Sequence, residues 1–414
     1  MVRIARPAFP LPANPINFCG IPPARTVAAA TKNLDPSSDL FNLGLVYLKG
    51  CLTIFGPWDC GGWLVAVASR KRLPSLLVQA AVAAFATFIG LPSSSADESG
   101  ASFWAPGTFA NLAAVPGEPG WSFSATYFHA TLMGGSNQAT SDTLPLFRRT
   151  TTLTVQLDAD IKTRVDLAIL TPGYTFATPV WGGRLGFNLY VPVGNARTEI
   201  DQLVTGALGP IGFANQNSIS DGLTSFGDPA PQLSLKWNQG VNNFMIYSRG
   251  GIPVGDYNPD RIVNLGDGHG SWDNGLGYTY FNTTTGIEFT AVSGLTYNFK
   301  NPHTDYQNGI DWHVDLEASR FLSKQFYVGA VGYSFNQLTG DTGSGAILGP
   351  YISRISAVGP EIGALFPVWG MQGSLNLRGY WEFAAQNRSS GWNTWLVFSI
   401  APTAPTERPP IVIK

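Results

Sequence analysis

The sequence predicts an all-β protein: a closed, antiparallel, up-and-down transmembrane β-barrel of twelve strands, preceded by a signal peptide. The composition is the first reason, because only 13% of the residues are charged, against about a quarter in ordinary soluble proteins. Aromatic residues reach 12% and there are 47 glycines. Membrane barrels have this profile because apolar and polar residues alternate along each strand and average out.

The second reason is that only one long apolar run occurs, at residues 73–91. Residues 70–72 before it are all basic, and the small residues 94–96 after it precede an acidic pair. A secretory signal has a basic region, an apolar core and a cleavage site of small residues, in that order. Residues 70–96 are therefore predicted to be a signal peptide. A permanent membrane helix is the alternative, and the charges on both flanks argue against it.

Residues 1–69 form a leader that this interpretation does not explain. All three cysteines, Cys19, Cys51 and Cys60, lie in it, so the exported portion would be free of thiols. We hypothesise a misassigned start, with translation beginning near residue 65. Residues 97–119 are then an N-terminal periplasmic or plug segment, residues 120–400 the barrel, and residues 401–414 a proline-rich tail.

The third reason is period-two alternation, which is clearest over residues 153–169. Leucine, valine and isoleucine dominate the odd positions, whereas the even positions carry five charges. A soluble sandwich would bury the apolar face and remains the alternative for this strand alone. The predicted strands are 121–133, 149–170, 181–192, 230–238, 241–254, 272–283, 286–299, 309–322, 325–338, 352–366, 370–384 and 391–400.

The connections between these strands alternate between long and short, as outer loops and periplasmic turns do in outer-membrane barrels. We expect the longest, residues 193–229, to fold inward and constrict the lumen. The charged face of each strand is expected to line a water-filled pore. The predicted pore-lining residues are Asp158, Asp160, Lys162, Arg164, Asp166, Arg184, Lys236, Arg249, Glu288, Asp311, His313, Asp315, Glu317, Arg378 and Glu382.

Short motifs in a fixed order carry a family resemblance. They include Gly255-Asp256-Tyr257, residues 301–309 (NPHTDYQNG), residues 311–315 (DWHVD) and residues 387–391 (NRSSG). From about residue 99 to residue 402 the chain resembles the outer-membrane proteins described as involved in the meta-pathway of phenol degradation. The resemblance implies a transporter-like barrel for aromatic or other hydrophobic compounds. The leader before Arg70 and the tail after Ile400 depart from the family pattern.

The sequence offers little support for catalysis. The four histidines, His129, His269, His303 and His313, show no metalloprotease spacing, and no Gly-x-Ser-x-Gly motif stands between a strand and a helix. The chain is therefore predicted not to be an enzyme, and no cofactor or metal is expected. The oxygen-rich stretch around Asn264 and Asp267 does not match the spacing of a calcium loop.

We therefore expect a passive channel in the bacterial outer membrane for small hydrophobic or aromatic solutes. The expected partners are outer-membrane lipid, the barrel assembly machinery and those solutes. After Ala96 the chain has 17 Lys and Arg against 24 Asp and Glu, which excludes an electrostatic nucleic-acid site. The alternatives are a non-conducting structural or ligand-sequestering barrel and an outer-membrane lipid hydrolase.

Overall fold

The computed structural model describes residues 102–146, 149–346 and 349–403, and the regular elements of this part of the chain are all strands. Leader, signal peptide and the tail from residue 404 lie outside it. The strands are β1 (Gly120–Leu146), β2 (Arg149–Thr175), β3 (Arg184–Leu208), β4 (Ile211–Phe226), β5 (Ala230–Gln239), β6 (Asn242–Gly251), β7 (Ser271–Asn282), β8 (Ile287–Asn298), β9 (Asp311–Phe321), β10 (Phe326–Gln337), β11 (Arg354–Val368), β12 (Met371–Gln386) and β13 (Ser390–Pro402).

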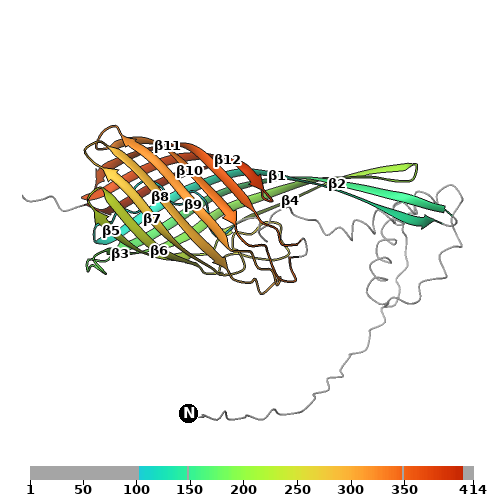
Figure 1. Ribbon diagram of the computed structural model, residues 1–414, viewed down its shortest axis with the longest axis horizontal. Coiled ribbons are helices and arrows are strands. Elements are labelled where there is room, and N and C mark those ends of the chain that lie inside the picture. The colour runs from blue at the N-terminus through green and yellow to red at the C-terminus, as the bar shows by residue number, and fades with distance from the viewer. Residues whose placement is uncertain (1–101, 147–148, 347–348, 404–414) are drawn as a thin grey trace, which may run out of the picture. The chain divides into compact units, whose positions relative to one another are not determined.

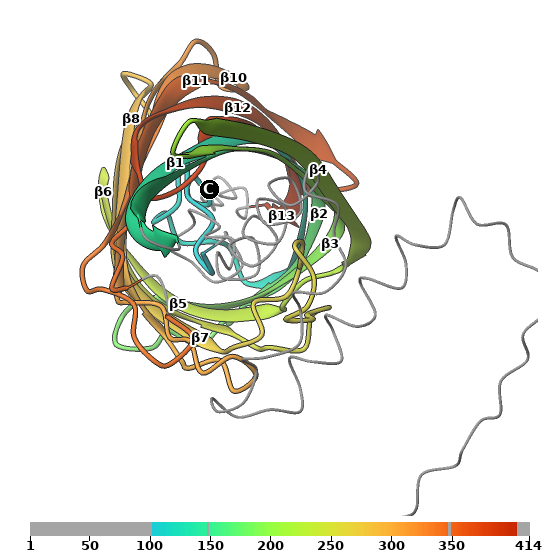
Figure 2. The same ribbon diagram turned by 90° about the vertical axis from the view of Figure 1, so that its right-hand side faces the viewer.

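Twelve of these strands form a closed antiparallel ring, which confirms the predicted fold class. Each strand from β5 to β13 pairs with its neighbour in sequence, and β3 pairs with both β2 and β5. The ring closes because β1 pairs with β2 on one side and with β13 on the other, in the register Phe123 with Ile400. Figure 2 looks along this ring. Each of the twelve predicted strands corresponds to one strand of the ring.

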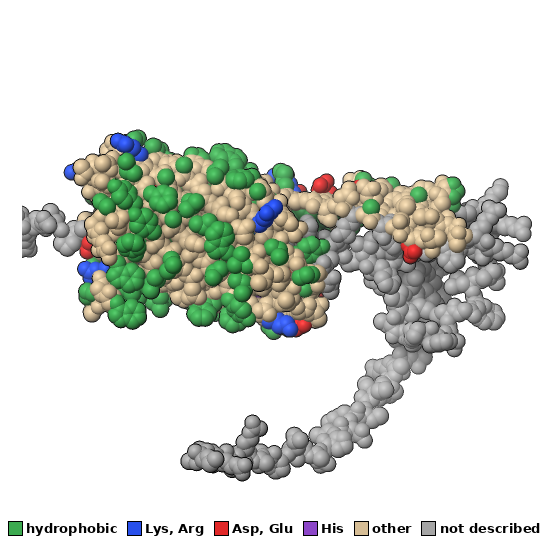
Figure 3. Space-filling model, in the orientation of Figure 1, with side chains coloured by type: hydrophobic (Ala, Val, Ile, Leu, Met, Phe, Trp, Pro, Cys, Tyr) green, Lys and Arg blue, Asp and Glu red, His purple; other side chains and the backbone are tan. Residues whose placement is uncertain are grey.

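The wall between β5 and β9 has an apolar outside and a polar inside. On β8, Glu288 and Thr290 are each only 1% exposed, whereas Phe289 and Leu295, which alternate with them, are 41% and 49% exposed. An exposed apolar residue on a barrel wall is suited to hydrocarbon rather than water. Hydrophobic side chains cover this wall in Figure 3, and most of the charged ones visible lie toward its ends.

A four-stranded extension continues from one end of the ring. The β1–β13 pairing ends at Met133 and Ser390, yet β1 remains paired with β2 as far as Leu146 and Arg149. Likewise β3 leaves β5 at Tyr190 and pairs with β4 as far as Leu208. The extension projects beyond the barrel in Figure 1.

The extension corrects the prediction for the long loops. Residues 193–229 do not fold into the lumen: most of them form the second half of β3 and its hairpin partner β4. The physical reason is that backbone pairing satisfies the N–H and C=O groups of residues beyond the membrane as well as inside it. In the described part of the chain, no helix has the length and apolar character needed to cross a membrane.

Replacing Leu276, which lies in the middle of β7 and is 67% exposed, tests the membrane-facing wall. We expect Leu276→Arg to destabilise the folded barrel in lipid vesicles by about 2–4 kcal/mol, the cost of a cation at the bilayer midplane. Urea titration followed by tryptophan fluorescence measures this. Leu203→Arg, in the extension, is the control and should change stability by less than about 0.5 kcal/mol. Equal costs at the two sites would contradict the assignment of the wall.

Candidate functional site

The lumen of the barrel contains the segment that precedes β1. We call residues 102–119 the plug. Its side chains are packed among strands that lie far away in the sequence: Trp104 is 1% exposed and Ala114 is fully buried, against Met245, Tyr247 and Val292. The plug runs inside the ring of strands in Figure 2.

Backbone N–H groups of the plug donate hydrogen bonds to carboxylates of the inner wall. Asp315 accepts from the amides of Gly107 at 2.9 Å and Phe109 at 3.0 Å. The amide of Leu112 donates to Glu288 at 3.2 Å. The plug has no regular secondary structure, so these groups need acceptors from elsewhere, and ionised carboxylates are strong ones.

Basic side chains hold the carbonyl groups of the same segment. Arg378 donates to the carbonyl oxygen of Thr108 at 3.4 Å, and Lys236 donates to that of Val115 at 3.5 Å. Just before the first of these contacts the chain turns at Gly107, whose φ of +87° favours glycine. A Cβ atom there would also lie 3.0 Å from the ring of Tyr380. The inner wall therefore fits the plug by charge and by shape.

An aromatic stack holds the first residues of the plug, around Trp104, against the inner wall. The Trp104 indole lies on the imidazole of His313, with ring centroids 3.7 Å apart and planes 12° from parallel. His313 Nε2 lies 2.8 Å from Asp273, and both side chains are fully buried. The Arg249 guanidinium lies 5.4 Å from the Trp104 ring and 3.9 Å from that of Tyr190. Cation–π contacts of this kind gain strength where water is excluded.

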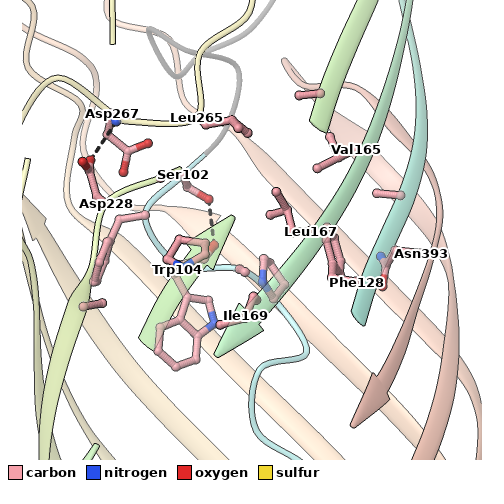
Figure 4. Close-up of a pocket in the computed structure, with 18 of the residues that line it drawn as sticks. Ser102, Trp104, Phe128, Val165, Leu167, Ile169, Asp228, Leu265, Asp267 and Asn393 are labelled. Atoms are coloured by element: carbon pink, nitrogen blue, oxygen red, sulfur yellow. Dashed lines mark hydrogen bonds between the residues drawn. The ribbon is translucent and has the colours of Figure 1, made fainter. Parts of the chain in front are cut away.

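A cavity of 270 Å³ lies between the plug and the wall formed by β1 to β3. Its surface is largely apolar, with Trp104 of the plug on one side and Val165, Leu167 and Ile169 of β2 on the other (Figure 4). Phe103 of the plug also lines it. Polar groups lie on both sides of the cavity, with Asp228 and Asp267 on one side and Asn393 on the other (Figure 4). The lining residues that supply polar groups are Asp228, Arg249, Asp267, Glu382, Arg388 and Asn393.

The outer loop between β6 and β7 contributes to the cavity and is tied to the barrel by Asp228. This carboxylate accepts from the amides of Gly255 at 2.6 Å and Asp267 at 2.8 Å (Figure 4). Within the loop, the hydrogen bond from Arg261 holds the pKa of Asp256 below its usual range. The loop therefore keeps this ion pair at pH values that would protonate an ordinary aspartate.

The structure brings together most of the residues that the sequence assigned to the lumen. Asp311, Asp315 and Glu317 on β9 are at most 2% exposed, and their apolar neighbours face outward. Arg184, the first residue of β3, pairs in register with Lys236 of β5. The Arg184 side chain also donates to the carbonyl of Ala177. The residues on the inner side of the ring are Arg184, Lys236, Arg249, Glu288, Asp311, His313, Asp315, Glu317, Arg378 and Glu382.

The prediction for β2 was wrong. Val165, Leu167 and Ile169 line the cavity, so the alternating Arg164 and Asp166 lie on the outer face. Lys162 pairs with Met133 at the last rung of the ring, while Asp158 and Asp160 lie in the extension. The outer positions become apolar only further along β2, at residues 168–174. The strand therefore enters the membrane later in the sequence than its alternation suggested.

Several interior residues escaped the sequence analysis. Asp273, Glu361 and Asn393 occupy inward positions of predicted strands, so alternation could have found them. Trp395 is 3% exposed and packs inside against Phe128. Nothing in the sequence singled out Trp104, because its segment has no periodicity. Within the described ranges, no group of three or more histidine, cysteine or acidic residues could hold a metal ion.

Fold and site together define a closed transmembrane β-barrel whose lumen holds an N-terminal plug and a largely apolar cavity. The chain belongs to the family described as "Putative MetA-pathway of phenol degradation", whose model matches residues 134–398. No curated protein matches the sequence.

Three solved structures share a low similarity with the chain. The COG4313 outer membrane channel from Pseudomonas putida F1 has 13% identity and a TM-score of 0.45, covering 72% of this chain and 99% of that one. A FadL homologue from Pseudomonas aeruginosa has 10% identity and a TM-score of 0.31, covering 68% and 89%. OccK10 (OpdN) from the same species has 9% identity and a TM-score of 0.26, covering 70% and 99%.

The Asp315 contacts predict how the plug is held. In Asp315→Ala the amides of Gly107 and Phe109 lose a charged acceptor, and hydrogen bonds to charged groups contribute about 1.5–3 kcal/mol each. We expect hydrogen exchange at plug amides to accelerate by at least about 10-fold, measured by mass spectrometry on the full chain in detergent. Asp160→Ala, in the extension, is the matched control. Unchanged plug exchange in Asp315→Ala would show that other contacts hold this segment.

Proposed function

We propose that the protein is a passive channel of the bacterial outer membrane that takes up small hydrophobic or aromatic solutes. The observation that carries this proposal is the cavity between the plug and the inner face of β1 to β3. Small-molecule sites typically measure about 300–1,000 Å³, so a cavity of 270 Å³ suits a solute of about one aromatic ring.

The polar groups around Glu382 suit a solute that carries a hydroxyl group. Glu382 accepts from the hydroxyl of Tyr333 at 2.6 Å and from the amide of Gly391 at 2.8 Å. A phenolic hydroxyl that reached this carboxylate would find a hydrogen-bond acceptor, while its ring lay against Leu167 and Ile169. The pattern of apolar walls with a few placed polar groups is typical of ligand pockets.

Passage beyond the cavity requires the plug to shift, because Trp104 and Phe103 form part of its wall. The hydrogen bonds that break would be those from plug backbone groups to Asp315, Glu288 and Arg378. Water can replace such bonds at modest net cost. The packing of Trp104 and Ala114 against the inner wall would rearrange as well. Transport of this kind is driven by the solute gradient and includes no chemical step.

The second candidate is a non-conducting barrel that sequesters its ligand. The number of contacts between plug and wall favours it, since a plug that never moves would leave the cavity as a closed binding site. Single-channel recording of the full chain in planar bilayers separates the two. Conductance steps, or flux of a phenol into liposomes, support the channel, and binding without either supports sequestration.

A substitution that fills the cavity tests the proposed route. Ala130 lies on its wall and is 2% exposed. We expect Ala130→Trp to reduce phenol flux into liposomes by at least about 10-fold, because the indole occupies the solute's volume. Ala318→Trp, on the outer face of β9, should leave flux unchanged. Heat-modified gel mobility confirms that both variants fold, and undiminished flux through folded Ala130→Trp would exclude this cavity from the route.

A further inference from the structure

The outer wall of the barrel carries a polar cluster that the transport proposal does not use. Tyr127, His129 and Thr131 occupy alternate positions of β1, and the residues between them, Phe128 and Ala130, line the cavity inside. His129 is paired in register with Asp166 of β2. The side chains of His129 and Asp166 are 21% and 44% exposed, so the cluster is open to the surroundings of the barrel.

Its members form one continuous chain of hydrogen bonds. His129 Nδ1 lies 2.7 Å from Asp166 Oδ1, and Thr131 Oγ1 lies 3.2 Å from His129 Nε2. The hydroxyl of Tyr127 donates to the same carboxylate oxygen at 2.6 Å. An ionised carboxylate only accepts, so Nδ1 of a neutral His129 carries the proton. Nε2 is then the acceptor, and Thr131 is the donor.

We propose that Thr131, His129 and Asp166 form an esterase site on the outer wall that acts on acyl esters of the surrounding lipid. Hydroxyl, imidazole and carboxylate stand in the order of nucleophile, general base and orienting acid, and such sites are recognised by geometry and roles rather than by sequence position. Hydrogen bonds within such sites measure about 2.6–3.2 Å. The distance from His129 to Asp166 lies within this range, and the distance from Thr131 to His129 lies at its upper limit.

The place of the cluster on the barrel indicates the substrate. Thr131 lies two residues before the last rung of the ring, and the outward positions of β2 become apolar beyond Asp166. The cluster therefore stands where apolar wall gives way to charged wall. The ester carbonyls of a membrane lipid occupy the same boundary, between acyl chains and headgroups. Trp392, with its ring 4.9 Å from that of His129, is an aromatic residue typical of this level.

The reaction is an acyl transfer to water. Thr131 Oγ1 attacks the ester carbonyl as its proton passes to His129 Nε2, and the carbon–oxygen bond to the lipid alcohol breaks as that alcohol takes the proton. Water then attacks the acyl-threonine, gives one proton to His129 and releases the fatty acid, and the proton returns to Thr131. Asp166 keeps Nδ1–H oriented and stabilises the imidazolium in both steps.

A cation stands beside the proposed nucleophile. Arg164 lies directly across the strand pair from Thr131, on the same outer face, and is itself opposite Arg197 of β3. Like charges in facing positions of a sheet repel each other unless an anion lies near them. Arg197 already has an anion, since its Nε lies 3.3 Å from Glu199. Arg164 is the cation available to the negative oxygen of a tetrahedral intermediate or to the phosphate of the same lipid.

His313 in the lumen and His129 on the outer wall differ in whether a lipid can reach them. His313 is fully buried under Trp104 and bonded to Asp273, where no lipid can reach it. His129, by contrast, lies on the outer face, because β1 turns Phe128 and Ala130 to the cavity.

The test uses the purified full chain in mixed micelles, with dioctanoyl phosphatidylcholine and p-nitrophenyl octanoate as substrates. We expect hydrolysis of both, reduced by at least about 100-fold in Thr131→Ala and in His129→Ala, as for loss of a general base. Thr131→Ser should retain activity. Thr154→Ala, in the extension, and His303→Ala, in an outer loop, are matched controls and should keep the full rate.

A second readout identifies the covalent intermediate. After brief mixing with p-nitrophenyl octanoate and an acid quench, peptide mass spectrometry should find one octanoyl group on Thr131 and none on Thr154. The proposal is overturned if the folded wild-type chain shows no hydrolysis above background, or if Thr131→Ala retains the wild-type rate. Phenol flux is an independent measurement, since Thr131→Ala leaves the cavity intact and Ala130→Trp leaves the outer cluster intact.

Discussion

The interior of this barrel depends on the hydrogen bonds between the plug and the charged residues of the inner wall. Aspartates and glutamates on β8 and β9 would be costly to enclose without partners, because burial penalises an unpaired charge. The plug, in turn, lacks regular secondary structure and has backbone groups to satisfy. Asp315, Glu288 and Arg378 meet both needs at once. The sequence predicts that these charged residues face water. In the fold, they bind the backbone of the plug instead.

This arrangement divides the lumen into two unlike halves. The plug lies against the charged strands, and the remaining space adjoins strands with apolar inward faces, where Val165, Leu167 and Ile169 lie. A uniformly polar pore would favour ions and sugars, whereas an apolar cavity beside a displaceable plug favours hydrophobic solutes. The proposed cargo and the proposed gate therefore follow from one asymmetry, the uneven distribution of charge around the ring.

The pair formed by β1 and β2 serves both surfaces of the barrel. Phe128 and Ala130 face the cavity, while His129 and Thr131 between them face outward and meet Asp166. Period-two geometry makes such a division automatic, since neighbouring residues of a strand point to opposite sides. A transport route and an esterase site can thus share one strand without sharing a residue, and each can be disabled without the other.

The sequence by itself determined the twelve strands of the ring and the polar inner face from β5 to β9. Alternation is a local pattern, and on these strands most polar residues occupy the inward positions. Only the tertiary structure decided which face of β2 looks inward, since alternation defines two faces without saying which encloses the lumen. It also decided that residues 193–208 continue β3 and that the plug enters the barrel. Gly107 and Asp315 meet across 208 positions, and an aperiodic segment carries no local signal of so distant a partner.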